Sequence, residues 1–334
     1  MTRVSKRTRA SRLTLGLGGL ALGVAACGSG ATEVTDPPPE QTAHPVVALG
    51  QARSVLDAVE SALLRGVDPT AAGSAADARL AGPYREIAVA DAKIAAERKT
   101  EVAEPAPVQQ VRLIVPTTKS WPRFFVAVGT TSKTSTPVIR VLTSPTPRAP
   151  YGLWAEALML PGATLPETAP AGTGSALVAP DTDGLAATPK EALSAFAGYL
   201  NAGSTASKQF QRSVYSDQLL QRLADDRKAL KAVASVSSKH TVGSSEPLAL
   251  RTADGGALVF GELKQEYVIT IKKGKGAVDV TDNDLAALAG GQKKINKSLT
   301  RTAVEVVVLN VPPRGKGLIT VIGAQKGDVK AVIK

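Results

Sequence analysis

The sequence has little sulfur, few imidazoles and few aromatic rings. Cys27 is the single cysteine among 334 residues, which excludes a disulfide bond within the chain and any multi-cysteine metal site. Two histidines, His44 and His240, give little basis for a histidine-based metal site. Aromatic residues make up 4% of the chain, so the stacking surfaces used by nucleic-acid-binding proteins are poorly supplied. We therefore expect no cofactor, no metal ion and no nucleic acid as a partner.

Long apolar runs are also lacking. The run from Leu13 to Ala26 has 14 residues, fewer than the roughly 20 that a membrane-spanning helix needs. It follows a segment with five basic and no acidic residues, at positions 1–12. A basic segment followed by a short apolar run is typical of a secretory signal, so we expect residues 1–26 to be a signal peptide.

The end of this run carries a more specific motif. It reads Leu22-Gly23-Val24-Ala25-Ala26-Cys27, followed by Gly28-Ser29-Gly30. The motif resembles the lipobox of bacterial lipoprotein precursors, and the composition beyond it resembles that of an actinobacterial chain. The resemblance implies cleavage between Ala26 and Cys27 and a diacylglyceryl group on the Cys27 thiol, which places the mature protein on the outer side of the cell membrane. The alternative is a plain secretory signal in which Cys27 is incidental.

Composition divides the rest of the chain. Residues 27–45 are small, polar and proline-rich, which predicts a flexible tether. A second stretch rich in proline, glycine and threonine, at 166–185, predicts a linker between one domain at 46–165 and another at 186–334.

Each half shows the same order of elements, two helical segments followed by a run of strands. Thr188-Pro189-Lys190-Glu191 is a good helix start, because threonine caps the helix and glutamate reaches back to the cap amide. This order predicts an α+β fold of two tandem domains, each with a curved antiparallel sheet. By element order alone, such domains resemble the cones of the nuclear-transport-factor and ketosteroid-isomerase folds, or cystatin.

Catalytic motifs are absent from the sequence. There is no Gly-x-Ser-x-Gly elbow and no phosphate-binding Gly-x4-Gly-Lys loop. The acidic cluster around Asp282 lacks the spacing of a calcium loop and is better read as a helix cap. Possible partners for a ketosteroid-isomerase-type site are Asp91 with Tyr84 or Asp217 with Tyr215, although nothing in the spacing selects these pairs and the alternative is surface acids beside core tyrosines. Trp121 and Trp154 could line a pocket, and the alternative is that they belong to the core.

Charge is distributed unevenly. Residues 13–189 carry a net charge of −3, whereas residues 190–334, with 22 basic and 13 acidic residues, carry +9. The local basic clusters are candidates for contact with an anionic surface: Lys272, Lys273, Lys275, Lys293, Lys294, Lys297, Arg314 and Lys316. Outside the cell, the partners available to such a surface are anionic lipids or anionic wall polymers. The alternative is an ordinary solvated face.

Together these features predict a membrane-anchored, extracytoplasmic lipoprotein that acts as a non-catalytic binding or assembly module of the cell envelope. Two alternatives remain open: a small-molecule enzyme of the ketosteroid-isomerase-like type with a site inside one cone, and a structural subunit of an envelope complex. A deep pocket with converging carboxylates and phenols favours the enzyme, whereas a basic surface favours the binding module.

Overall fold

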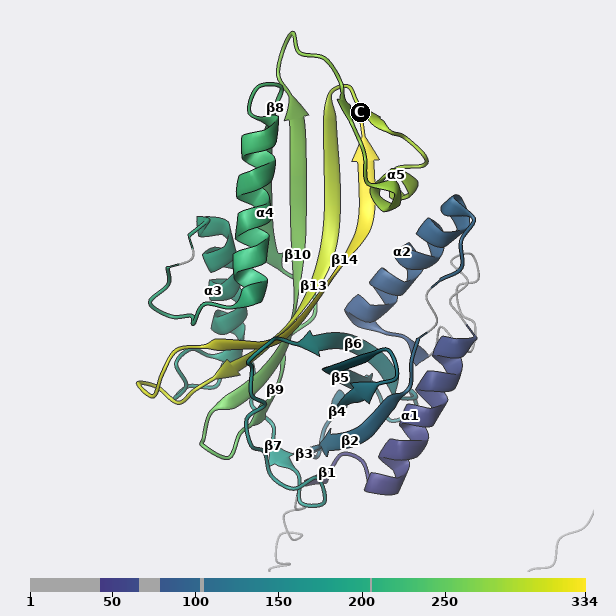
Figure 1. Cartoon of the computed structure of the whole chain (residues 1–334). Helices are drawn as coiled ribbons and strands as arrows, with labels where there is room; N and C mark the ends of the chain where they lie inside the picture. Colours follow the sequence, from purple (N-terminus) through teal and green to yellow (C-terminus); the bar gives the residue numbers. More distant parts are fainter. Residues whose placement is uncertain (1–42, 66–78, 103–104, 205) are drawn as a thin grey trace, which may run out of the picture. The chain divides into compact units, whose positions relative to one another are not determined.

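The computed structural model describes residues 43–65, 79–102, 105–204 and 206–334. The signal peptide, the Cys27 motif and most of the tether lie outside these residues. Residues 42–334 group into one compact unit of mixed α and β structure (Figure 1). Among the described residues, no helix has both the length and the apolar character needed to cross a membrane.

One nine-stranded antiparallel sheet organises this unit. Its strands from the first half are β2 (Val108–Ile114), β4 (Arg123–Thr131), β5 (Thr134–Ser144) and β6 (Gly152–Met159). Those from the second half are β14 (Thr320–Ile333), β13 (Ser298–Val311), β10 (Ala257–Ile271) and β8 (Ala234–Val242), in that order across the sheet, with β9 (Leu248–Arg251) also paired to β10. β6 joins β14 through Met159 and Leu158, which pair with Gly323 and Ala324.

This join corrects the prediction of two tandem domains at 46–165 and 186–334. Both halves contribute strands to one sheet, and the predicted linker at 166–185 is part of the fold. Its strand β7 (Ser175–Ala176) pairs with β3 (Pro116–Thr118), and β3 also pairs with β1 (His44–Pro45). Val178 and Leu185 in the same stretch are buried. A proline- and glycine-rich composition therefore marks a connection without long strands, but not a boundary between domains.

The predicted order of elements in each half is confirmed. Helices α1 (Leu49–Leu64) and α2 (Gly82–Arg98) precede the strands of the first half, and α3 (Pro189–Ala202) and α4 (Val214–Leu230) precede those of the second. The start of α3 is the predicted capping box: the Glu191 amide donates to the Thr188 hydroxyl, and the Thr188 amide donates to the Glu191 carboxylate. The short helix α5 (Asn283–Leu288) is capped by Asp282, as the sequence predicts.

The helices cover both faces of the long strands. In β13, Val307 pairs with Gly261 of β10, and Val304 pairs with Gly327 of β14. Positions 304 and 307 point to opposite faces because side chains alternate along a strand. A Cβ on Gly261 would lie 2.3 Å from Leu193 of α3, and one on Gly327 would lie 2.7 Å from Ile87 of α2. These glycines let α3 pack closely on one face of the sheet and α2 on the other.

Strand β8 follows α4 closely, since α4 ends at Leu230 and β8 begins at Ala234. His240 is buried in this strand. β8 is an edge strand, and Asn201 of α3 pairs with the backbone amide and carbonyl of His240 at 2.7 and 2.8 Å. The last strand, β14, continues to Ile333.

Candidate functional sites

The structure brings six of the eight predicted basic residues to one end of the unit. Strand β10 ends there and strand β13 begins there. Backbone hydrogen bonds join Ile271 to Lys297, Val280 to Lys293 and Lys297 to Lys334. The Lys272 side chain donates to the carbonyl of Lys231, at the end of α4. We call this surface the basic end and define it by eight exposed lysines: Lys231, Lys272, Lys273, Lys275, Lys293, Lys294, Lys297 and Lys334. It lies at the top of Figure 1.

Acidic residues lie beside the basic end without neutralising it. Asp279 pairs with Lys294 in the short β11–β12 ribbon (Val278–Asp279 and Lys294–Ile295). Asp282 is used as the cap of α5, and Asp284 forms an ion pair with Arg98 of α2. The lysines thus outnumber the carboxylates at this end of the sheet.

The other two predicted basic residues lie elsewhere. Arg314 and Lys316 are exposed in the turn after β13, whereas Lys297 directly precedes this strand. The 14 residues of β13 separate the two clusters by about 45 Å at roughly 3.3 Å per residue. Arg314 also lies 3.8 Å from the Asp183 carboxylate. Arg314 and Lys316 therefore form a cluster of their own, apart from the other six candidates.

The two tryptophans line one pocket, and Trp154 also belongs to the buried core. This pocket has a volume of about 660 Å³ and is mainly apolar. Trp121 comes from the β3–β4 connection and Trp154 from β6, and residues 177–180 and 245–249 complete the wall. Because the chain holds only these two tryptophans, all of its indole groups are at this pocket. A largely apolar pocket with few polar groups is the usual form of a small-molecule site.

A smaller pocket of about 310 Å³ contains the predicted pair Tyr84 and Asp91. Both residues lie on α2 and face Arg140 and Glu156. Burial, and next the Glu156 carboxylate, raise the pKa of Tyr84 to about 12. Burial, reinforced by Asp284, raises the pKa of Asp91. The pocket therefore holds a neutral phenol beside a carboxylate that accepts a proton more readily than usual.

The other predicted pair does not form a site. Asp217 forms an ion pair with Arg212 at 2.8 Å. Tyr215 instead points to Glu305, and burial followed by that carboxylate raises its pKa well above the usual value.

A buried polar group around Glu305 was not predicted from the sequence. Glu305 of β13 has no exposed surface, and one of its carboxylate oxygens lies 3.4 Å from His240 Nε2 of β8. Lys326 of β14 is paired with Glu305 in the sheet register, and burial lowers the pKa of its ammonium group. The alternation of Ala234, Val236 and His240 along residues 234–240 was a signal for a strand with His240 on its buried face.

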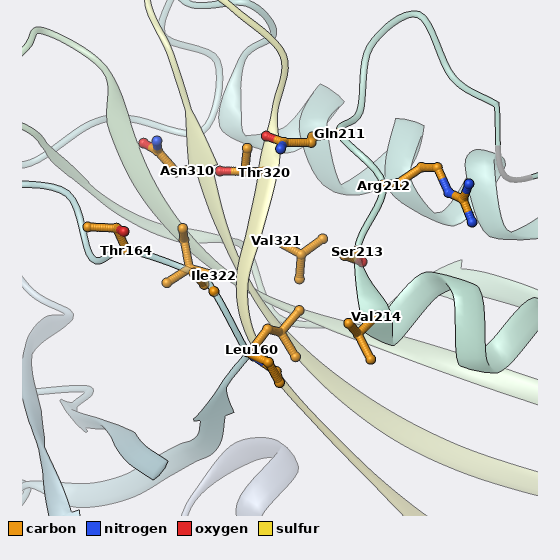
Figure 2. A pocket seen from close by; sticks show the side chains of 13 residues that line it. Leu160, Thr164, Gln211, Arg212, Ser213, Val214, Asn310, Thr320, Val321 and Ile322 are labelled. Atoms are coloured by element: carbon orange, nitrogen blue, oxygen red, sulfur yellow. The ribbon is translucent and has the colours of Figure 1, made fainter.

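A third pocket lies where α4 begins (Figure 2). Its volume is about 390 Å³, and Asn310, Thr320 and Gln211 gather on one side of it, with Leu160 and Ile322 nearby. Its mixed lining favours no single class of ligand over another.

Comparisons with known proteins place the folded unit in a family without assigning a role to any of these sites. Residues 43–332 match the model of a family described as "Domain of unknown function (DUF8094)". Comparison with curated proteins and with solved structures gives no match. The matched residues span nearly all of the compact unit and most of the chain, and the protein therefore belongs to the DUF8094 family.

Proposed function

We propose that this protein is a lipid-anchored, extracytoplasmic binding module of the cell envelope that contacts an anionic polymer through its basic end. The anchor is a diacylglyceryl group on Cys27, proposed from the lipobox-like motif. The observation that carries the binding role is the gathering of eight exposed lysines from four chain segments at one end of the sheet. Clustered like charges raise the local concentration of a polyanion and speed its association.

The point where the tether joins the unit favours a polymer over the lipid headgroups. The described chain begins beside β1, which connects through β3 and β7 to the bridge between Leu177 and Leu250 of β9. β9 pairs with the first residues of β10, whereas the basic end follows the last residue of that 15-residue strand. The attachment point and the basic end are thus separated by about 45 Å along the sheet.

Binding to a defined polyanion tests this role. The probe is soluble inorganic polyphosphate, and the protein is the chain from position 27 onward carrying Cys27→Ala. A basic residue near an anionic surface contributes about 1 kcal/mol. We therefore expect the triple variant Lys272→Gln, Lys273→Gln, Lys275→Gln to bind about tenfold or more weakly at low salt, and with a weaker dependence on salt.

The matched control is the double variant Arg314→Gln, Lys316→Gln, which removes exposed charge at the other end of β13. It should bind polyphosphate almost as the parent protein does. An equal loss in both variants, or binding that does not respond to salt, would show that the lysines act only as ordinary surface charge. Tighter binding to phosphatidylglycerol vesicles than to polyphosphate would assign the basic end to lipid instead.

The second candidate function is a proton-transfer enzyme of the ketosteroid-isomerase-like type. One observation favours it: Tyr84 and Asp91 line the same pocket and both have raised pKa values. However, the Arg140 guanidinium in that pocket donates to Glu156, Glu60 and the Ala106 carbonyl, at 2.7, 3.1 and 2.9 Å. These hydrogen bonds account for the charged groups around Arg140 as a structural network. We therefore favour the binding module over the enzyme.

A further inference from the structure

The pocket at Trp121 and Trp154 plays no part in the function proposed above. We propose that it binds the alkyl chain of a lipid-like amphiphile. Its volume of about 660 Å³ lies within the range of small-molecule sites, and it is the largest of the pockets described above. Its floor includes Phe124 and Trp154, which also belong to the buried core between the strands. An apolar ligand would therefore extend a hydrophobic core that is already formed.

The scarcity of polar groups on the wall favours a hydrocarbon. The polar side chains that line the pocket are Ser120, Thr143, Ser245 and Glu246. Two of the hydroxyls already have protein partners, since Ser120 shares a hydrogen bond with Thr118 and Ser245 pairs with Glu262. A sugar, nucleotide or peptide would leave several of its own polar groups without partners, at a cost of about 1–3 kcal/mol each. An alkyl chain has no such groups.

The pocket is also pre-formed. A Cβ on Gly82 would lie 2.3 Å from Trp154, so the glycine allows this indole to pack directly on the start of α2. The Arg123 guanidinium stacks over the Trp121 ring, 3.7 Å from its centroid, which fixes the second indole. The wall further contains Pro122, Pro145, Pro180 and Pro247. Proline restricts the backbone and has no N–H group, so these connections stay rigid without adding donors.

Charge near the pocket favours an anionic headgroup. Ala81 and Gly82 line it at the N-terminus of α2, where no side chain caps the helix and the helix dipole is positive. The Arg123 guanidinium does not line the pocket, but it is stacked on Trp121, which does, and its Nε is buried without a hydrogen-bond partner. The lining also includes one carboxylate, the exposed Glu246. The balance predicts that a fatty-acid carboxylate binds more tightly than the corresponding alcohol.

The two tryptophans make the test direct, because all indole fluorescence arises at this pocket. The chain from position 27 onward, carrying Cys27→Ala, is titrated with dibromostearate, whose bromine atoms quench indoles on contact. We expect saturable quenching that unbrominated stearate reverses. Each single-tryptophan variant, Trp121→Phe and Trp154→Phe, should retain quenching, because both rings line the same site. Dibromostearyl alcohol has the same alkyl chain with a neutral head, so comparing its affinity with that of dibromostearate tests the role of the headgroup. Weaker binding of the alcohol indicates that the site takes an anionic lipid, and equal binding indicates that only the alkyl chain is recognised.

A variant in which a larger side chain fills the pocket provides the decisive comparison of affinities. Thr143 is the register partner of Phe124, so its side chain lies on the same face, and Thr143→Phe should weaken binding at least tenfold. Thr241→Phe, at an exposed position on β8, is the matched control and should bind as the parent does. Absence of saturable quenching in the parent protein, or equal affinity in the two phenylalanine variants, would overturn the proposal. Failure of polyphosphate binding would leave this result unchanged, because the two sites are separate.

Discussion

Replacing Arg140 with methionine is expected to lower the free energy of unfolding by about 3 kcal/mol. Arg140 is 2% exposed and donates to Glu156 of β6, to Glu60 of α1 and to the Ala106 carbonyl. Glu60 in turn accepts from the Val108 amide of β2 at 2.8 Å. Removing the guanidinium leaves two largely buried carboxylates, with side chains 18% and 25% exposed, next to an apolar group. Urea unfolding, followed by circular dichroism, measures the change.

The matched control is Arg112→Met on strand β2 of the same sheet, where the arginine is exposed. Surface substitutions of this kind change stability by less than about 0.5 kcal/mol. Arg140→Lys should fall between the two, because lysine keeps the charge but cannot reach three acceptors with a planar fork. A loss for Arg140→Met no larger than that for Arg112→Met would show that the network does not hold α1 to the sheet.

Replacing Cys27 is expected to abolish lipid attachment entirely. Cys27 is the chain's single thiol, and under the proposed function it carries the thioether-linked diacylglyceryl group. Two acyl chains give stable membrane attachment, whereas one gives only marginal binding. Metabolic labelling of cells with a palmitate analogue should mark the parent protein and fail to mark Cys27→Ala.

Cys27→Ser is the closer control, because serine retains a nucleophilic hydroxyl at nearly the same size. It should also remain unlabelled and leave the membrane fraction. Labelling that persists in either variant would contradict the anchor. An unlabelled parent protein that is released into the medium would instead indicate a plain secretory signal.

The sequence predicted features that depend on neighbouring residues. The capping box of Thr188 and Glu191 is one, because both partners lie within one helical turn. The order of helices and strands is another, because periodicity is a local property.

Features that depend on distant pairing were not predictable. Nothing near Met159 indicates that β6 pairs with Gly323, yet this contact turns two expected domains into one sheet. The same limit explains why the positions of the basic residues in the fold were not predicted. Because β10 and β13 are antiparallel, the lysines at 272–275 and 293–297 lie at one end of the sheet, and Arg314 and Lys316 lie at the other. The meeting of Trp121 and Trp154 in one pocket likewise depends on how β4, β5 and β6 pair.

Hydrogen–deuterium exchange with and without polyphosphate tests the central claim most directly, because it locates the bound polymer on the chain. The proposed function predicts slower exchange at residues 272–276 and 292–297, most of which are exposed and which carry six of the lysines of the basic end. It predicts no change at residues 312–319, the turn that holds Arg314 and Lys316. Protection confined to that turn, or no protection at either segment at saturating polyphosphate, would contradict the assignment of the basic end as the binding surface.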